Sequence, residues 1–91
     1  MRSFEQAFRI PAGHRLEQVR TRARGGIIKG TYWDHDEYDA TGHLVARYHS
    51  FVELGENGEY CCGWRKYNRA GTLVDAEDLV SSRKRTLFDN A

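Results

Sequence analysis

A run of four residues, Asp34 to Glu37, combines three carboxylates with one imidazole, and a second imidazole, His49, follows it in the chain. Carboxylate oxygens and imidazole nitrogens are the ligands that divalent metals such as zinc take in proteins. Two imidazoles and one carboxylate brought to one place would hold such an ion. A metal-dependent enzyme is therefore one hypothesis for this chain.

The two imidazoles meet only if the chain between them folds back in one particular register. In the hairpin that we expect, His35 lies opposite Arg47. The side chains of His35, Glu37 and His49 then share one face of the sheet. The alternative is a solvated face on which Arg47 neutralises the acids, because sheets commonly present one polar face. A shift of one residue would move a side chain to the opposite face and dissolve the cluster.

The other candidates for catalysis lack their partners. His14 stands alone after a glycine, and no histidine occurs in triad order with a serine or cysteine nucleophile. The glycines Gly25, Gly26 and Gly30 do not match a phosphate-binding loop, because the Lys-Ser/Thr signature is missing. Cys61 and Cys62 are adjacent, so on a strand they point to opposite faces and make neither a mutual disulfide nor a zinc site. We expect no catalytic residues and no cofactor.

Aromatic and polar residues on the expected strands favour a non-catalytic binding module whose partner is a protein. The polar face of the sheet also carries Val45 and Phe51, and exposed apolar surface of this kind often marks an interface. Strands at the edges of a sheet can pair with a second copy of the chain or with another protein, so a homodimer is reasonable. The predicted contact residues are Trp33, His35, Arg47, His49, Phe51 and Trp64.

An uneven distribution of charge supports an alternative, the binding of single-stranded nucleic acid. Residues 1–33 carry a net charge of +5, residues 34–62 carry −6 and residues 63–91 carry +2. Basic side chains beside aromatic residues on a sheet are typical of such binding. The basic residues concerned are Arg20, Arg22, Arg24 and Lys29. The opposing interpretation is that the two halves of the domain attract each other, since an acidic sheet repels phosphate.

Residues 38–45 and 67–74 are two copies of one unit, with Tyr, Gly, Leu and Val at matching positions. Asp or Asn after the Tyr opens a type I turn through its side chain, and the Gly closes the loop in a left-handed conformation. The Tyr and Leu of each copy then face each other across the two strands. The unit resembles the YD hairpin repeat of Rhs-type shell proteins, and this resemblance implies a β-hairpin without implying an activity.

These turns, with a further hairpin signal at Asn57-Gly58, divide the middle of the chain into strands. The strands that we expect cover residues 27–38, 43–54, 59–67 and 72–74. They follow one another in sequence, and the short turns between them predict an antiparallel meander.

The two ends of the chain are less regular. Residues 15–24 have apolar residues at helical spacing, which favours a helix, with a strand as the alternative. Phe4 and Phe8 either stack on a short helix or lie on a strand that Pro11 ends. Asp75 would cap a second helix over residues 76–88.

The length of 91 residues suits a single domain over residues 1–91, with eleven aromatic residues supplying much of a small core. No apolar run approaches the ~20 residues of a membrane helix, and residues 1–10 do not form a signal peptide. We expect a cytoplasmic protein without membrane contact. The predicted fold class is α+β, with a four- to five-stranded antiparallel meander sheet and one or two short helices.

Overall fold

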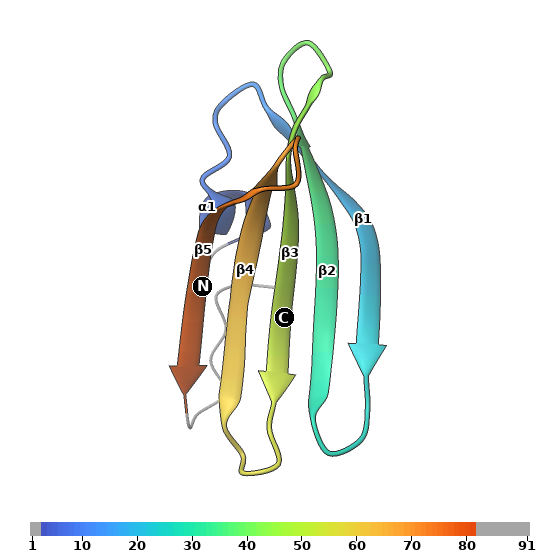
Figure 1. Ribbon diagram of the computed structural model, residues 1–91, viewed down its shortest axis with the longest axis vertical. Helices are drawn as coiled ribbons and strands as arrows, with labels where there is room; N and C mark the ends of the chain where they lie inside the picture. The colour runs from blue at the N-terminus through green and yellow to red at the C-terminus, as the bar shows by residue number, and fades with distance from the viewer. Residues whose placement is uncertain (1–2, 82–91) are drawn as a thin grey trace.

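A computed structural model describes residues 3–81, which form a five-stranded antiparallel sheet and one short helix (Figure 1). Each strand pairs with its neighbour in sequence, in the order β1-β2-β3-β4-β5. The elements are α1 (Phe4–Phe8), β1 (Arg15–Arg24), β2 (Lys29–Tyr38), β3 (Leu44–Leu54), β4 (Tyr60–Asn68) and β5 (Leu73–Ser81). The predicted α+β class and the antiparallel meander are confirmed. No helix among residues 3–81 is long and apolar enough to cross a bilayer.

The repeated unit forms the same turn between β2 and β3 and between β4 and β5. Gly42 and Gly71 have positive φ angles of 85° and 83°. The side-chain oxygens of Asp39 and Asn68 each accept hydrogen bonds from the backbone N–H groups two and four positions further on. The prediction that these side chains and glycines build two equivalent hairpins is therefore confirmed.

The register around the first hairpin differs from the expected one. Tyr38 lies opposite Leu44, as predicted, but the next residue of β2, Glu37, pairs with Ala46. Val45 is thus an extra residue on β3, and this β-bulge shifts all later pairs by one position. The expected pairing of His35 with Arg47 is therefore wrong, and His35 lies opposite Tyr48. Because side chains on a strand alternate between faces, this shift puts His35 and Arg47 on opposite faces of the sheet.

Both ends of the described chain correct a helix prediction. Residues 15–24 form strand β1, because hydrogen bonding to β2 outweighs the helical spacing of their apolar residues. Residues 73–81 form strand β5 along β4, so the helix predicted from Asp75 does not begin there. Residues 82–88 of that predicted helix lie outside the described residues. Helix formation at Phe4–Phe8 was one of the two expectations, and it is the one observed.

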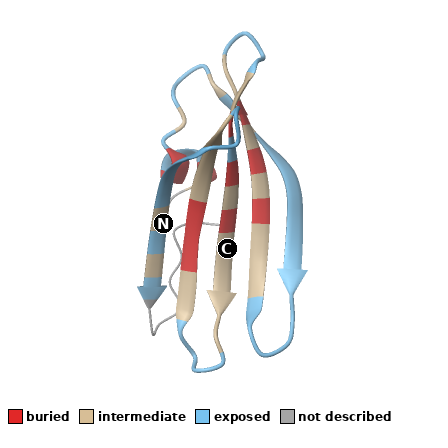
Figure 2. Ribbon diagram, viewed as in Figure 1, coloured by how far each residue is buried: buried red, intermediate tan, exposed pale blue. Residues whose placement is uncertain are grey.

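Helix α1 covers one face of the sheet and completes the core. A capping box starts the helix: the Ser3 hydroxyl accepts from the Gln6 N–H, and the Gln6 side chain accepts from the Ser3 N–H. Phe8 stacks on Tyr48 with ring centroids 4.2 Å apart, and it meets Trp64 edge-on at 5.3 Å. Buried residues accordingly gather on α1 and the three central strands (Figure 2). We call this side of the sheet the covered face and the opposite side the open face.

Candidate binding face

The six predicted contact residues divide equally between the two faces of the sheet. On the covered face, Trp33, His35 and Trp64 are 6%, 4% and 1% exposed. Arg47, His49 and Phe51 lie on β3 at the positions that alternate with the buried Tyr48 and Ser50, so they belong to the open face. The covered residues pack beneath α1, and the open-face residues are the ones that a partner can reach.

A shallow hollow of about 470 Å³ occupies the open face across strands β1 to β4. Charged side chains from β1, β2 and β3 surround it, together with the phenol ring of Tyr67 on β4. Its lining residues are Val19, Arg20, Asp34, His35, Asp36, Arg47, Tyr48, His49 and Tyr67. His35 and Tyr48 border it from strand positions whose side chains are buried on the covered face.

Asp34 is the centre of the polar network in this hollow. Its Oδ2 accepts from the Arg20 Nε at 2.9 Å, and its Oδ1 lies 2.9 Å from the His49 Nδ1. Partial burial acts to raise the pKa of Asp34, but the hydrogen bonds from His49 and Arg20 outweigh it and hold that pKa below its usual value. The carboxylate of Asp34 therefore holds the His49 ring through its Nδ1.

Two aromatic side chains extend the open face beyond the hollow. The Tyr32 ring lies nearly parallel to the His49 ring, with centroids 6.3 Å apart and an interplanar angle of 14°. Hydrogen bonding to Glu53 is the main reason why the pKa of Tyr32 is raised. Phe51 lies over Gly63, where an added Cβ would come within 3.0 Å of its Cζ. The open face thus combines flat rings with charged groups.

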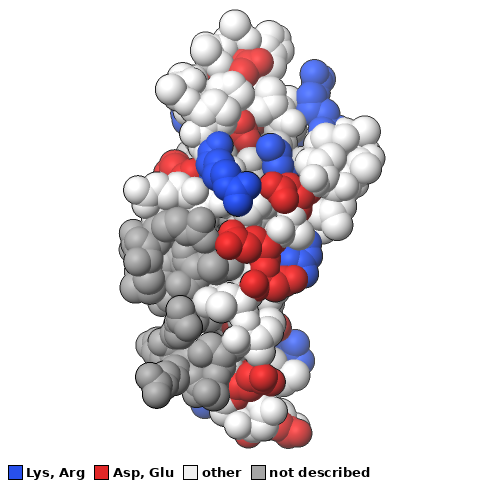
Figure 3. All heavy atoms as spheres, turned by 90° about the vertical axis from the view of Figure 1, so that its left-hand side faces the viewer, with Lys and Arg blue, Asp and Glu red and all other residues white. Residues whose placement is uncertain are grey.

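Most of the charges on this face are already paired within the molecule. Besides the Arg20–Asp34 pair, Arg47 Nε lies 3.4 Å from Asp36 Oδ1, and Arg65 contacts both carboxylate oxygens of Asp78. Acidic and basic side chains also lie close together on the side of the molecule that carries β5 (Figure 3). The open face is consequently a surface of mixed charge rather than a basic or acidic patch.

Strand β1 contains another β-bulge, which the sequence did not predict. It determines the face of the sheet on which the basic residues of β1 lie. Gln18 pairs with His35, but Arg20 pairs with the adjacent Asp34, so Val19 is an extra residue. The bulge turns Arg20, Arg22 and Arg24 onto the open face, although uninterrupted alternation from Leu16 would place them on the covered face. Lys29, the fourth residue of the nucleic-acid hypothesis, pairs with Leu54 at a covered-face position.

The metal cluster expected from His35, Glu37 and His49 does not form. His35 and Glu37 are buried on the covered face, whereas His49 bonds to Asp34 on the open face. The bulge at Val45 explains the difference, because it changes the register by one residue. Among residues 3–81, no three His, Cys, Asp or Glu side chains are grouped closely enough to hold a metal ion.

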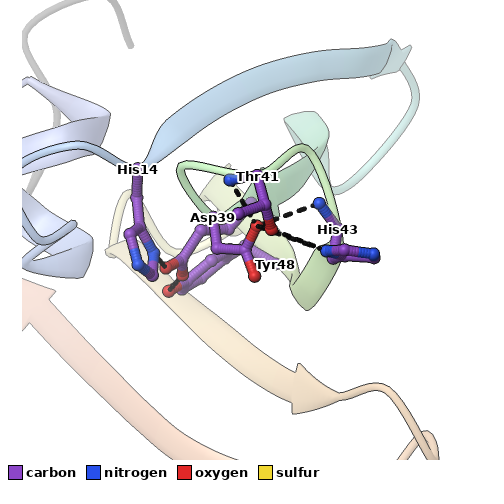
Figure 4. A network of polar contacts seen from close by, with 6 residues as sticks. His14, Asp39, Thr41, His43 and Tyr48 are labelled. Atoms are coloured by element: carbon purple, nitrogen blue, oxygen red, sulfur yellow. Dashed lines mark hydrogen bonds and ion pairs between the residues drawn. The ribbon is translucent and has the colours of Figure 1, made fainter.

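The covered face instead holds a buried cluster of polar side chains that the sequence pattern did not predict. The Tyr48 hydroxyl donates to Glu37 Oε1 at 2.6 Å, and the His14 Nδ1 lies 2.6 Å from Glu37 Oε2. His14 lies in the loop before β1 and Tyr48 lies on β3, so the two come from different parts of the chain (Figure 4). Burial, and then the bond to Glu37, raises the pKa of Tyr48. The cluster ties the loop before β1 to the centre of the sheet, which is a structural task.

His35 is buried without a hydrogen bond to its Nδ1 in the described structure. Its ring lies against Phe4, with centroids 4.4 Å apart, and burial lowers its pKa against the opposing effect of Glu5, Asp34 and Asp36. A neutral imidazole is therefore part of the core.

Comparison of the chain with protein-family models, with curated proteins and with solved structures finds no match.

Proposed function

We propose that this chain is a non-catalytic binding module and that its open face contacts a partner protein. The observation that carries the proposal is the asymmetry of the sheet. Helix α1 covers one face, while the other presents a hollow bordered by Arg47 and His49, with Phe51 nearby. Arginine and aromatic residues are enriched in protein interfaces, and their surroundings here are held in place by hydrogen bonds.

The paired charges favour a protein partner over a small charged ligand. Each arginine of the hollow already contacts a carboxylate, so the net charge that it offers is small. The hollow therefore suits a part of the partner surface that carries both signs of charge. His49 is fixed by Asp34 and stacked near Tyr32, which lowers the entropy cost of placing it in an interface.

A second copy of the chain is a partner of this kind, and a homodimer remains part of the proposal. The two edge strands, β1 and β5, support it because each offers an unpaired backbone edge within the described sheet. The compartment that we propose is the cytoplasm, and the unbridged thiols of Cys61 and Cys62 are consistent with a reducing environment.

Site-specific photocrosslinking in the source cell tests the open face directly. A photoreactive phenylalanine analogue replaces Arg47, whose side chain is 67% exposed, and in a control protein it replaces the exposed Glu56 in the β3–β4 turn. The proposal expects a discrete protein adduct from position 47 alone. After purification of that partner or of the homodimer, Phe51→Ala should weaken its binding by roughly tenfold. The same adducts from both positions, or none from either, would count against the proposal.

Single-stranded nucleic acid is a second candidate, favoured by the bulge that places Arg20, Arg22 and Arg24 beside Tyr32. Arg22 lies 5.9 Å from the centroid of the Tyr32 ring, so a basic row and a flat ring are neighbours. A salt titration distinguishes the two functions. Phosphate contacts predict a steep linear fall of log affinity with log salt concentration, whereas a protein interface of mixed charge predicts a shallow one.

A further inference from the structure

We propose that the free edge of β1 binds an extended acidic peptide segment, which adds to the sheet as a sixth strand. This inference rests on the proposed protein-binding function and names the class of partner. This edge lies beside the hollow, which Val19 and Arg20 of β1 line.

The outer edge of β1 is open within the described residues. β1 pairs with β2 alone and lies at one side of the sheet (Figure 1). Nine of its ten residues are exposed, and Leu16 is the half-buried exception. The backbone N–H and C=O groups that point away from β2 therefore offer a ladder of hydrogen bonds, which is the usual basis of strand addition.

The bulge at Val19 gives this edge its chemical preference. It places Arg20, Arg22 and Arg24 on the open face that Arg15 already occupies, where Glu17 is the only acid of the strand. Arg15 pairs with Glu17 and Arg20 with Asp34, whereas Arg22 and Arg24 form no ion pair within residues 3–81. Both contact the side chain of Tyr32, Arg22 over its ring and Arg24 by a hydrogen bond, and neither guanidinium is neutralised by a carboxylate in an ion pair among these residues.

An added strand presents every second side chain to this row. Cross-strand neighbours on one face lie about 4.5–5.5 Å apart, which suits a carboxylate meeting a guanidinium. A segment with acids at alternate positions would therefore match both the hydrogen-bond ladder and the spacing of Arg22 and Arg24. An added strand without charges would gain only the backbone hydrogen bonds, and the charged side chains of β1 disfavour its pairing.

The neighbouring strand makes nucleic acid the weaker choice. Asp34 and Asp36 on β2 share the open face with the arginine row and would repel a phosphate chain lying across it. A peptide that continues the sheet stays outside β1 and meets the arginines before it meets these acids. Nucleic acid also offers no partner for a row of backbone groups in strand geometry.

Fluorescence anisotropy with the full chain tests the inference. The probe is a labelled ten-residue peptide of alternating glutamate and threonine, titrated at low salt concentration. Two further peptides serve as controls: one has the same sequence N-methylated at its central residues, and the other has the same composition with its glutamates grouped at one end. Strand addition predicts saturable binding of the first peptide and a loss of at least roughly tenfold for both controls.

Protein variants assign the binding to the edge. Arg22→Glu and Arg24→Glu should each weaken the peptide by several-fold, because an opposed pair becomes a repulsive one. Arg69→Glu, with the same change of charge in the β4–β5 turn, is the matched control and should bind like the wild type. Circular dichroism confirms that the variants are folded.

Four results would overturn the inference. Equal binding of the N-methylated peptide would show simple charge attraction, tighter binding of an oligothymidine would assign the arginine row to nucleic acid, and no binding of any peptide would leave the edge without this ligand. None of these affects a crosslink at position 47, so failure here and failure of the open-face proposal are distinguishable. A concentration-dependent dimer that the peptide does not displace would assign the edge to a second copy and also overturn the inference.

Discussion

The same strands form both faces of the sheet, but the two faces accommodate their polar and charged side chains in different ways. On the covered face, aromatic rings from α1 and three strands enclose a few buried polar groups. On the open face, charges are balanced in pairs that remain in contact with water. Asp34 and His35 are adjacent in sequence, yet one anchors a surface network and the other is a neutral core residue. Position along a strand thus decides what a polar residue does.

The largest expected difference in stability is between the removal of an aromatic ring from the covered face and from the open face. Trp33→Ala should lower the free energy of unfolding by about 3–5 kcal/mol, because a buried ring leaves a cavity. Phe51→Ala should cost clearly less, since Phe51 is only half-buried on the open face. Urea denaturation measures both. Equal losses would mean that the open face is as much a core as the covered one.

A smaller effect is expected at the buried carboxylate. Glu37→Ala leaves the Tyr48 hydroxyl and His14 without their shared acceptor and should cost roughly 2–4 kcal/mol. Asp36→Ala, on the adjacent open-face position, removes a pair with an exposed arginine and should cost less than about 1 kcal/mol. If the two variants are equally stable, the cluster beneath α1 is not a structural tie.

The pH dependence of stability should differ between neighbours on the two faces. His35 has a lowered pKa in the folded protein, so the unfolded chain binds more protons as the pH falls below about 6.5, and stability declines there. Asp34 also has a lowered pKa, but its contribution is lost only as the pH falls below about 3.8. In denaturation series across pH, His35→Phe should flatten the first decline, and Asp34→Asn should reduce the second. A first decline that survives His35→Phe belongs to another group.

The smallest effect on stability should accompany an open-face charge. Arg47→Ala should change the free energy of unfolding by less than about 0.5 kcal/mol, because the side chain is largely exposed. It should nevertheless weaken the binding of the partner found by crosslinking, as measured by calorimetry. A large loss of stability with unchanged affinity would reverse the roles assigned to the two faces.

Local turn chemistry was predictable from the sequence, and long-range register was not. The turns at Gly42 and Gly71 depend on a few adjacent residues, and both formed as expected. Strands β1 and β5 have apolar spacing that also fits helices, and only the neighbouring strands decide between the two.

Because the register could not be predicted, only three of the six predicted contact residues lie on the open face. Arg47, His49 and Phe51 lie on the reachable face, while Trp33, His35 and Trp64 do not. The expected register, which placed Trp33 and His35 on the face of Arg47 and His49, lacked the bulge at Val45. Val45 and Val74 are bulge residues at the same position of the two repeat copies, and Val19 is a third bulge outside the repeat. Each bulge exchanges the two faces for the part of the strand beyond it, and the repeat was interpreted without one.

The order of the strands also has a kinetic consequence. Because β1 to β5 are neighbours in space in the same order as in sequence, every pairing closes only a short loop. Topologies of this kind avoid the slow search for distant partners that delays most β-proteins. The meander should therefore assemble one hairpin at a time and fold quickly for a β-protein, with the tight Asp39 and Asn68 turns as natural starting points.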